Sequence, residues 1–519
     1  MRMLTGLKKI MSANHKQNKS QIVDKKDMGV LTGILHEDFN QIKQLFEGAA
    51  DFAYRELGIN STTSVIILFL DGLVDMERIE LHVINPLVKQ NEKLLQQSKP
   101  TMDDIKAVLS SAQIVEGTTF EQVIDQILSG GTVVLINGCQ KALFLSQQSW
   151  EQRSVEEPLT EAVVLGPREG FTENIRTNVS MIRRRLKTTK LKFEYMKIGN
   201  LSQTEVCITY LDSIAQFSIV EEVRSRLNQI KIDAIEDSGY ILELIEDHPY
   251  SVFPQIVQTE RPDRVVGNLL EGRVGIIVDN SPFVLIVPVT FFQMMNSPED
   301  YYGRFIMTSF IRFIRYLFLL IALMFPAIYI AVTTFHHELM PTNLLFSVAA
   351  SREKVPFPAV VEVLLMEITF EALREAGLRL PRPIGSTVSI VGALVIGQAA
   401  VEAGIVSAPL VIVVSTTGIA SFMFPNYAFT GAIRLLRFIM MFLAANLGFY
   451  GILLGVFFIV AHLVQLRSFG IPYLAPIAPF TFNNLKDIFI RAPWWKMNER
   501  PEQTGKRNLK RLGPRNRKY

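Results

Sequence analysis

Charge and cysteine are both scarce in this chain of 519 residues. Lys, Arg, Asp and Glu make up 20% of the chain, against about 25% in a typical soluble protein. The formal net charge is only +3, so no chain-wide basic field points to a nucleic-acid partner. The two cysteines, Cys139 and Cys207, are too few for a disulfide framework and favour a reduced, cytosolic setting.

Motifs of the common enzyme classes are absent as well. The sequence has no Walker A loop, no dinucleotide-binding fingerprint, no His-Glu-x-x-His pair and no nucleophile elbow. His336-His337-Glu338 predicts a polar loop rather than a metal site, because adjacent residues on a helix or strand point apart. Asp71 and Asp212 each end an apolar strand, where Asp commonly opens a turn. A catalytic role for these two is the weaker interpretation, and we expect no enzyme, no metal and no cofactor.

Apolar residues, in contrast, are abundant. They make up 49% of the chain, which includes 34 Phe, and this excludes a disordered or fibrous protein. The apolar excess lies almost entirely after residue 304. The sequence therefore predicts a membrane protein with a large soluble front half. No secretory signal precedes that half, so we expect it on the cytoplasmic side.

Two segments of the front half resemble each other. Val65–Asp71 and Val206–Asp212 are both apolar strands that end in Leu-Asp, and each is followed by a similar helix and strand pair at nearly the same distance. This spacing favours a duplicated α/β unit. In the second unit, the predicted helix Glu173–Leu186 carries Arg183-Arg184-Arg185. These arginines favour a solvated helix face, or one near an anionic membrane, over a phosphate or lipid headgroup site.

The predicted fold class is a multi-domain integral membrane protein, with two tandem α/β cytoplasmic subdomains followed by an all-α transmembrane domain. About four to six membrane segments are expected, including Phe313–Phe335 and a hairpin within Ile433–Leu466 that breaks near Asn446-Leu-Gly448. Arginines before the first span and a basic tail place both chain ends in the cytoplasm. The predicted boundaries are a disordered polar leader 1–30, subdomains 31–150 and 151–300, the transmembrane domain 301–470 and a basic tail 471–519.

The predicted span Ser386–Ala403 contains the first candidate site. Gln398 and Glu402 share a helix face, which Val391 and Val395 continue. An ionisable residue at membrane depth is a functional candidate, because its burial is costly. Valines beside a polar mouth suit a pore that is gated by dewetting. The alternative is that Glu402 lies at the water interface.

An acidic stripe marks a second candidate, on the predicted helix 359–376. Glu367 and Glu371 are spaced i, i+4 with Glu375 one turn further, and Glu362 is offset from them. In a symmetric oligomer this stripe would form acidic rings that attract cations, whereas in a single chain it would be a solvated face beside the bilayer. Gly451 and Gly455 form a GxxxG pair in the last apolar stretch, which predicts close helix packing.

Four long strings in the second half resemble the A subunits of GerA-type spore germinant receptors. They are Ser297–Tyr302, Ser351–Pro358, Leu373–Gly385 and Ile390–Ser407, and the resemblance extends from about residue 31 to 490. It implies a two-part cytoplasmic domain before a membrane domain in the inner membrane of a dormant spore. It also implies three kinds of partner: a transporter-like B subunit that binds the nutrient, a lipoprotein C subunit, and further copies of this chain in a ring, expected to be a pentamer. That ring would be a ligand-gated channel for monovalent cations.

Other functions remain open from the sequence. The resemblance also covers auxiliary germination channels that act without a nutrient-binding partner. A secondary transporter usually has inverted membrane repeats, and the repeat found here lies in the soluble half. A membrane-anchored scaffold would have no need of Gln398 and Glu402 in a span. The sequence does not indicate which nutrient triggers the receptor, how many copies form the ring, or which ions pass.

Overall fold

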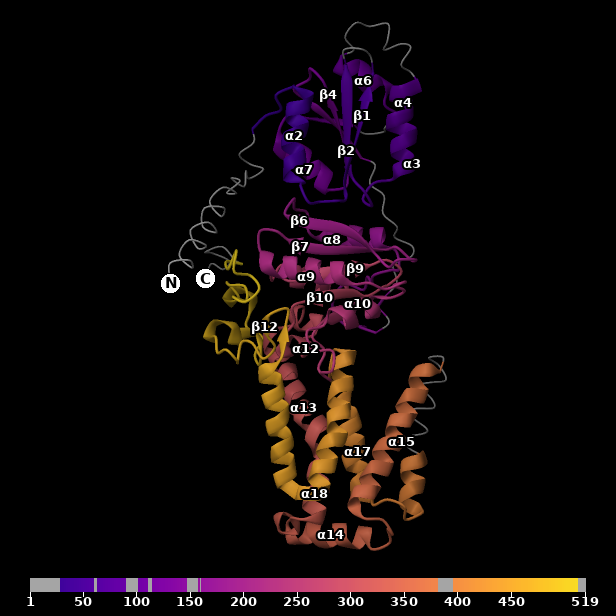
Figure 1. Cartoon of the computed structure of the whole chain (residues 1–519), viewed down its shortest axis with the longest axis vertical. Helices are drawn as coiled ribbons and strands as arrows, with labels where there is room; N and C mark the ends of the chain where they lie inside the picture. Colours follow the sequence, from indigo (N-terminus) through magenta and orange to yellow (C-terminus); the bar gives the residue numbers. More distant parts are fainter. Residues whose placement is uncertain are drawn as a thin grey trace. The chain divides into compact units, whose positions relative to one another are not determined.

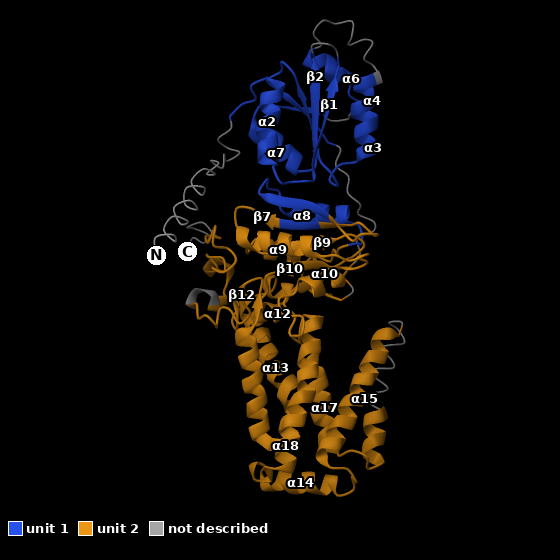
Figure 2. Cartoon of the chain, viewed as in Figure 1, with its two compact units in different colours: residues 1–155, 172–196, 207–209 blue, residues 156–171, 197–206, 210–519 orange. Residues whose placement is uncertain are grey.

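The computed structural model describes residues 29–59, 63–89, 101–110, 114–146, 157–158, 160–380 and 395–511. Val391 and nearly all of the predicted leader lie outside these residues. The chain divides into two compact units (Figure 2). One contains residues 1–155, 172–196 and 207–209, and the other contains residues 156–171, 197–206 and 210–519.

An antiparallel sheet of five strands, in the order β1-β2-β4-β5-β3, organises the first α/β region. Strand β2 (Ser64–Leu70) lies between β1 and β4 and is apolar from Val65 onward, because both of its faces are buried. Its even-numbered side chains pack with helices α2 and α7, and its odd-numbered ones pack with α3, η2 and α6. Figure 1 shows these two helical layers on opposite sides of the sheet. The other elements are β1 (Phe52–Gly58), β3 (Ile114–Gly117), β4 (Thr132–Ile136), β5 (Ala142–Leu145), α2 (Leu35–Leu45), α3 (Met76–Ile79), η2 (Glu80–Ile84), α4 (Asn85–Lys89), α6 (Met102–Val108) and α7 (Phe120–Leu128).

A second sheet of five strands has the order β6-β7-β9-β10-β8, which repeats the order of the first. Helix α8 precedes β6 as α2 precedes β1, and α11 precedes β9 as α7 precedes β4. The duplicated α/β unit expected from the sequence is therefore present in the topology. Its elements are α8 (Ile175–Arg185), β6 (Leu191–Ile198), β7 (Thr204–Leu211), α9 (Phe217–Gln229), α10 (Ser238–Ile245), β8 (Val257–Thr259), α11 (Pro262–Leu269), β9 (Val274–Val278) and β10 (Val284–Val287).

One arginine of the basic run in α8 is not on the surface. Arg183 is fully buried and donates two hydrogen bonds to the Asp51 carboxylate, at 2.8 and 2.7 Å. Its guanidinium also lies over the Phe193 ring, 4.9 Å from the ring centre. Arg183 is therefore neither part of a solvated helix face nor free to bind a phosphate or headgroup, because Asp51 already neutralises its charge inside the protein.

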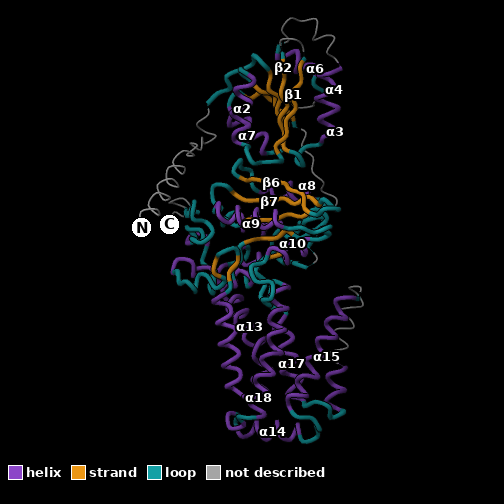
Figure 3. Tube along the Cα trace, viewed as in Figure 1, coloured by secondary structure: helices purple, strands orange, loops and turns teal. Residues whose placement is uncertain are grey.

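The rest of the chain is mainly helical (Figure 3). Helices α13 and α18 are long and apolar enough to cross a membrane, and α17 is a shorter apolar helix. Helix α13 contacts α15, α17 and α18. The bounds are α12 (Phe291–Met294), η3 (Pro298–Tyr301), α13 (Phe305–Thr334), η4 (His337–Leu339), α14 (Thr342–Arg352), α15 (Ala359–Arg379), α17 (Ala408–Ser421) and α18 (Tyr427–Gln465).

Helix α18 reverses direction at Gly448, whose φ is 61° and ψ is −140°. An L-residue rarely adopts this backbone conformation, whereas glycine does so without a Cβ clash. The reversal falls within the Asn446-Leu-Gly448 stretch where the sequence predicted the break. It turns the second half of the helix back along the first.

The described part of the C-terminal tail is folded. It forms β11 (Arg467–Ser468), β12 (Ile471–Pro472), η5 (Phe482–Asp487) and η6 (Trp494–Lys496). Tyr473 is fully buried and donates a 2.7 Å hydrogen bond to the Pro254 carbonyl. Arg500 donates a 2.7 Å bond to the Leu270 carbonyl. The tail therefore packs on the segment that contains α11.

Candidate functional site among the C-terminal helices

Three of the predicted pore-lining residues, Val395, Gln398 and Glu402, lie in the helical stretch 395–402. Gly397 and Ala400 are buried, and a Cβ on Gly397 would meet the Val411 side chain of α17 at 3.5 Å. Val395 is 56% exposed, and Gln398 and Glu402 are exposed as well. Gly397 and Ala400 thus face the chain's own helices, and Val395, Gln398 and Glu402 face away from them.

Gln398 and Glu402 also interact with each other. The Gln398 Nε2 donates a 3.0 Å hydrogen bond to the Glu402 Oε1. This is the i, i+4 contact expected for one helix face. Because Val391 lies outside the described residues, the structure places only three of the four predicted pore residues.

Glu362 is buried at 1% exposure near the start of α15. Its Oε1 accepts a 3.2 Å bond from Arg352 of α14, and its Oε2 accepts one of 3.2 Å from the Ser407 backbone amide at the start of α17. The Ser407 hydroxyl also lies 3.2 Å from the Tyr329 hydroxyl of α13. One carboxylate therefore ties together the ends of α14, α15 and α17.

Glu367 and Glu371 pair with arginines of α18. Glu367 is 1% exposed and forms a 3.0 Å ion pair with Arg437. One turn further along α15, Glu371 pairs with Arg434. The sequence analysis did not identify either arginine as a partner. A signal was available: Arg434 and Arg437 lie one turn apart near the start of an apolar run, and Glu367 and Glu371 lie one turn apart on α15, so the two pairs can meet.

The acidic stripe is therefore largely neutralised within the chain. Glu362, Glu367 and Glu371 each have an arginine partner, and the exposed Glu375 pairs with Arg379 of its own helix. Buried carboxylates require such partners because an unpaired charge is costly inside a protein. Among the described residues, no group of three or more His, Cys, Asp or Glu is arranged to hold a metal ion. The stripe's influence on cations remains a prediction.

The predicted packing glycines lie at the close contact between the two halves of α18. A Cβ on Gly451 would overlap the Leu443 carbonyl oxygen, and one on Gly455 would overlap the Met440 sulfur. These glycines let the returning half of the helix approach the first half.

A further charged cluster, which sequence reasoning also missed, surrounds the start of α13. Asp300 accepts hydrogen bonds from Arg312 at 3.0 Å and from Arg315 at 2.9 Å. Arg312 also binds Asp487 of the tail at 2.7 Å. Tyr301 donates a 2.6 Å bond to the same Asp487. Burial, reinforced by the charge of Asp487, raises the pKa of the Tyr301 hydroxyl well above its usual value, so it stays a donor.

Comparison with known proteins identifies the family of this chain. Residues 40–503 match the family described as "Bacillus/Clostridium GerA spore germination protein". The chain is 48% identical to "Uncharacterized membrane protein YfkQ" of Bacillus subtilis (strain 168), over 93% of this chain and 94% of that protein. It is 45% identical to "Spore germination protein KA" of the same organism, over 92% and 88% of the two chains.

A solved structure also matches. It is the N-terminal domain of the A subunit of the Bacillus megaterium spore germinant receptor GerK3, at 33% identity and a TM-score of 0.41, covering 50% of this chain and 97% of that one. The family match covers residues 40–503, and the two Bacillus subtilis relatives are 48% and 45% identical over more than nine-tenths of this chain. The chain therefore belongs to the GerA family of spore germination proteins.

Proposed function

We propose that the chain is a subunit of a nutrient-responsive spore germination receptor and that copies of it form a ligand-gated cation channel in the inner membrane of the spore. Opening of this channel would release monovalent cations and end dormancy. The partners would be a transporter-like B subunit that binds the nutrient and a lipoprotein C subunit. In this proposal the chain moves ions and catalyses no reaction.

One observation carries the channel proposal. Val395, Gln398 and Glu402 are exposed on a helix whose opposite, small-residue face packs on the same chain. An exposed ionisable residue beside apolar helices needs water or a polar partner. A ring of copies would supply both, with the valines as a hydrophobic constriction and Gln398 and Glu402 as its polar side. Family membership and the two apolar helices support the membrane location.

The test is potassium efflux from spores that carry Val395→Ala or Glu402→Ala, with and without nutrient. A smaller side chain at position 395 widens the constriction, so Val395→Ala should leak potassium without nutrient. Glu402→Ala should alter the nutrient-triggered rate, because it removes the charge beside the path. Val460→Ala is the matched control, since Val460 is also an exposed valine but lies on α18.

Protein levels must be equal in all strains. Unchanged efflux in both variants would contradict a pore at this helix. The ion path would then lie along α15 or outside this chain. The purified chain in a planar bilayer separates the remaining alternatives. Conduction without any partner favours an auxiliary channel, whereas an assembled ring that never conducts favours a scaffold.

A further inference from the structure

The C-terminal tail runs along the first turns of α13. The carbonyl of Ile488 accepts a 3.4 Å hydrogen bond from the Tyr316 hydroxyl. Further along the tail, the ring centre of Trp495 lies 5.8 Å from that of Phe305, the first residue of the helix. Residues 488–495 therefore follow α13 backwards, from Tyr316 to its beginning.

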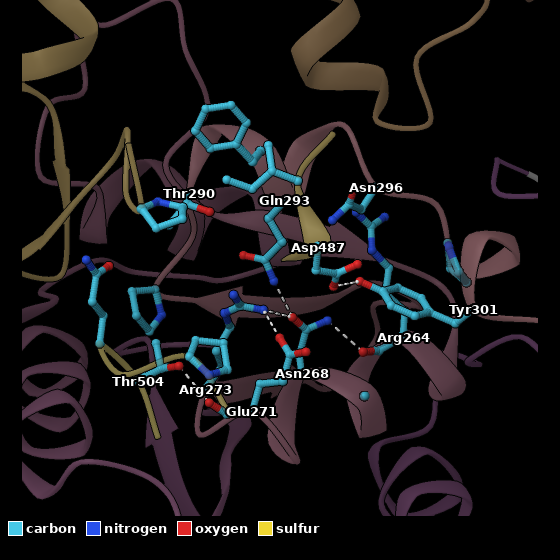
Figure 4. A pocket seen from close by; sticks show the side chains of 18 of the residues that line it. Arg264, Asn268, Glu271, Arg273, Thr290, Gln293, Asn296, Tyr301, Asp487 and Thr504 are labelled. Atoms are coloured by element: carbon cyan, nitrogen blue, oxygen red, sulfur yellow. Dashed lines mark hydrogen bonds and ion pairs between the residues drawn. The ribbon is translucent and has the colours of Figure 1, made fainter. Parts of the chain in front are cut away.

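Polar contacts hold the tail in this position. Asp487 accepts a 2.6 Å hydrogen bond from the Tyr301 hydroxyl and one of 2.7 Å from Arg312, and Figure 4 shows the side chains of Tyr301 and Asp487 directed toward each other. The backbone amide of Arg491 donates a 3.1 Å bond to the Ser309 hydroxyl. All of these residues belong to the same compact unit. The outward side chains of the tail thus have a defined place relative to the helix.

These outward side chains are apolar. Ile490 is 64% exposed, and Phe489 and Trp495 are exposed as well. The neighbouring side of α13 has the same character, because Ile306, Phe310 and Phe313 are exposed too. Phe305 and Tyr316, which contact the tail, lie about 80–100° around the helix from Ile306. The tail and α13 therefore form one continuous apolar surface, which consists of Ile306, Phe310, Phe313, Phe489, Ile490 and Trp495 and is called the tail surface below.

The length of α13 places the tail surface at the level of the lipid headgroups. A helix of 30 residues is about 45 Å long, whereas the hydrocarbon core of a bilayer is about 30 Å thick. The exposed residues His337 and Glu338 follow the helix, which puts one boundary of the core near Thr334. The core then extends back about 20 residues, to the neighbourhood of Tyr316. The turns that contact the tail therefore lie outside the core, in the headgroup layer.

The chemistry of the tail surface fits that layer. Aromatic residues are enriched at both membrane–water interfaces, where a ring can be half in lipid and half in water. In water, by contrast, a contiguous exposed apolar patch marks a surface that binds a partner. Because the tail surface continues the exposed side of a helix long enough to cross a membrane, the bilayer itself is the partner that it fits.

We propose that the tail segment 489–495 binds the phospholipid headgroup layer, with Phe489, Ile490 and Trp495 inserted beside α13. The tail would then be attached to the membrane along its own length as well as through α18. This inference rests on the membrane location in the proposed function, and the experiment below tests the two separately.

The test measures how brominated phosphatidylcholine quenches tryptophan emission from the full chain in phosphatidylcholine vesicles. The sequence has three tryptophans, so Trp150→Phe with Trp494→Phe leaves Trp495 as the sole emitter. One lipid carries bromine near the headgroup end of its acyl chain, and the other carries it near the methyl end. We expect a larger loss of Trp495 emission with the first lipid than with the second.

Two controls use a chain in which all three tryptophans are replaced by Phe. Phe457→Trp places the emitter at an exposed position in the returning half of α18, and bromine near the methyl end should quench it more strongly. Leu201→Trp places it at an exposed position between β6 and β7, and neither lipid should quench it. Circular dichroism establishes that every variant is folded.

The outcomes separate the two proposals. If neither lipid quenches Phe457→Trp, the membrane location is overturned and the tail proposal with it. If Phe457→Trp is quenched and Trp495 is not, only the tail proposal is overturned. Protection of Trp495 from acrylamide in the water phase would then assign the tail surface to a second copy of the chain. Stronger quenching of Trp495 by bromine near the methyl end would also overturn the proposal, because Trp495 would lie too deep for the headgroup layer.

Discussion

At the scale of single residues, the two fully buried glutamates of α15, Glu362 and Glu367, are each paired with an arginine. Glu367 and Arg437 are both nearly inaccessible and lie on different helices, α15 and α18. A buried ion pair adds little net stability, since desolvation offsets the attraction, yet removal of one partner leaves an uncompensated charge. This pair therefore fixes which faces of α15 and α18 meet.

Glu367→Gln should destabilise the chain by about 3–5 kcal/mol, because Arg437 would remain buried without a counter-charge. Thermal unfolding of the purified chain in detergent measures the loss. Glu375→Gln is the matched control: its pair with Arg379 is exposed, and such pairs contribute little. The double variant Glu367→Leu with Arg437→Met should recover most of the stability. Equal melting temperatures for the two single variants would show that the pair is not buried.

Cysteine reactivity provides a second test at this scale. Burial raises the pKa of both thiols, and Cys207 is fully enclosed whereas Cys139 is partly exposed. Less thiolate is then present at neutral pH, and the thiolate is the reactive form. A disulfide reagent such as DTNB should modify Cys139 slowly in the native chain, and faster as the pH rises toward 9. In a Cys139→Ser variant, Cys207 should react only after unfolding. Rapid modification of Cys207 in the folded chain would contradict its placement in β7.

At the scale of elements, the reversal in α18 depends on Gly448. Its φ is positive, and an added Cβ would lie 2.9 Å from the His336 Nε2 and 3.2 Å from the Phe335 Cβ. Gly448→Ala should therefore cost about 1–3 kcal/mol through backbone strain, with the steric contact added to that. Gly431→Ala, in the first half of the same helix with open space around it, should be neutral or stabilise by up to about 1 kcal/mol. Melting temperatures check this, and a loss at position 431 equal to that at 448 would contradict the argument.

Sequence patterns predicted these elements because the patterns are local. The continuous apolar run of β2 indicates a strand that is buried on both faces. The two strands that end in Leu-Asp indicate a duplicated unit, and the two sheets do have the same strand order. Gly448 marked the helix break because few other residues adopt that backbone conformation. The partner of Arg183 was not predictable, since Asp51 lies in a segment far away in the sequence. For Glu367, the spacing of Arg434 and Arg437 was the one sequence signal that pointed to its partner. Hydropathy records that a residue is polar and carries no information about which distant residue neutralises it.

At the scale of the larger compact unit, the C-terminal tail meets two consecutive elements, η3 and α13, at the start of α13. Asp300 comes from η3, Arg312 and Arg315 come from α13, and Asp487 comes from the tail. Asp300 contacts both arginines, whereas Asp487 contacts Arg312 and the Tyr301 hydroxyl. The two carboxylates are therefore unequal, and their substitution should reveal a defined order.

Asp300→Asn leaves two buried arginines with one remaining carboxylate and should cost about 3–5 kcal/mol, as broken buried ion pairs do. Asp487→Asn leaves Arg312 paired with Asp300 and still accepts a hydrogen bond, so its cost should be about 1–2 kcal/mol. Asp212→Asn, at an exposed pair with Arg507, should leave the melting temperature unchanged. If Asp487→Asn were as damaging as Asp300→Asn, the tail and not η3 would hold the start of α13. The connection between the folded tail and the helices would then be the stronger one, opposite to the order expected from these contacts.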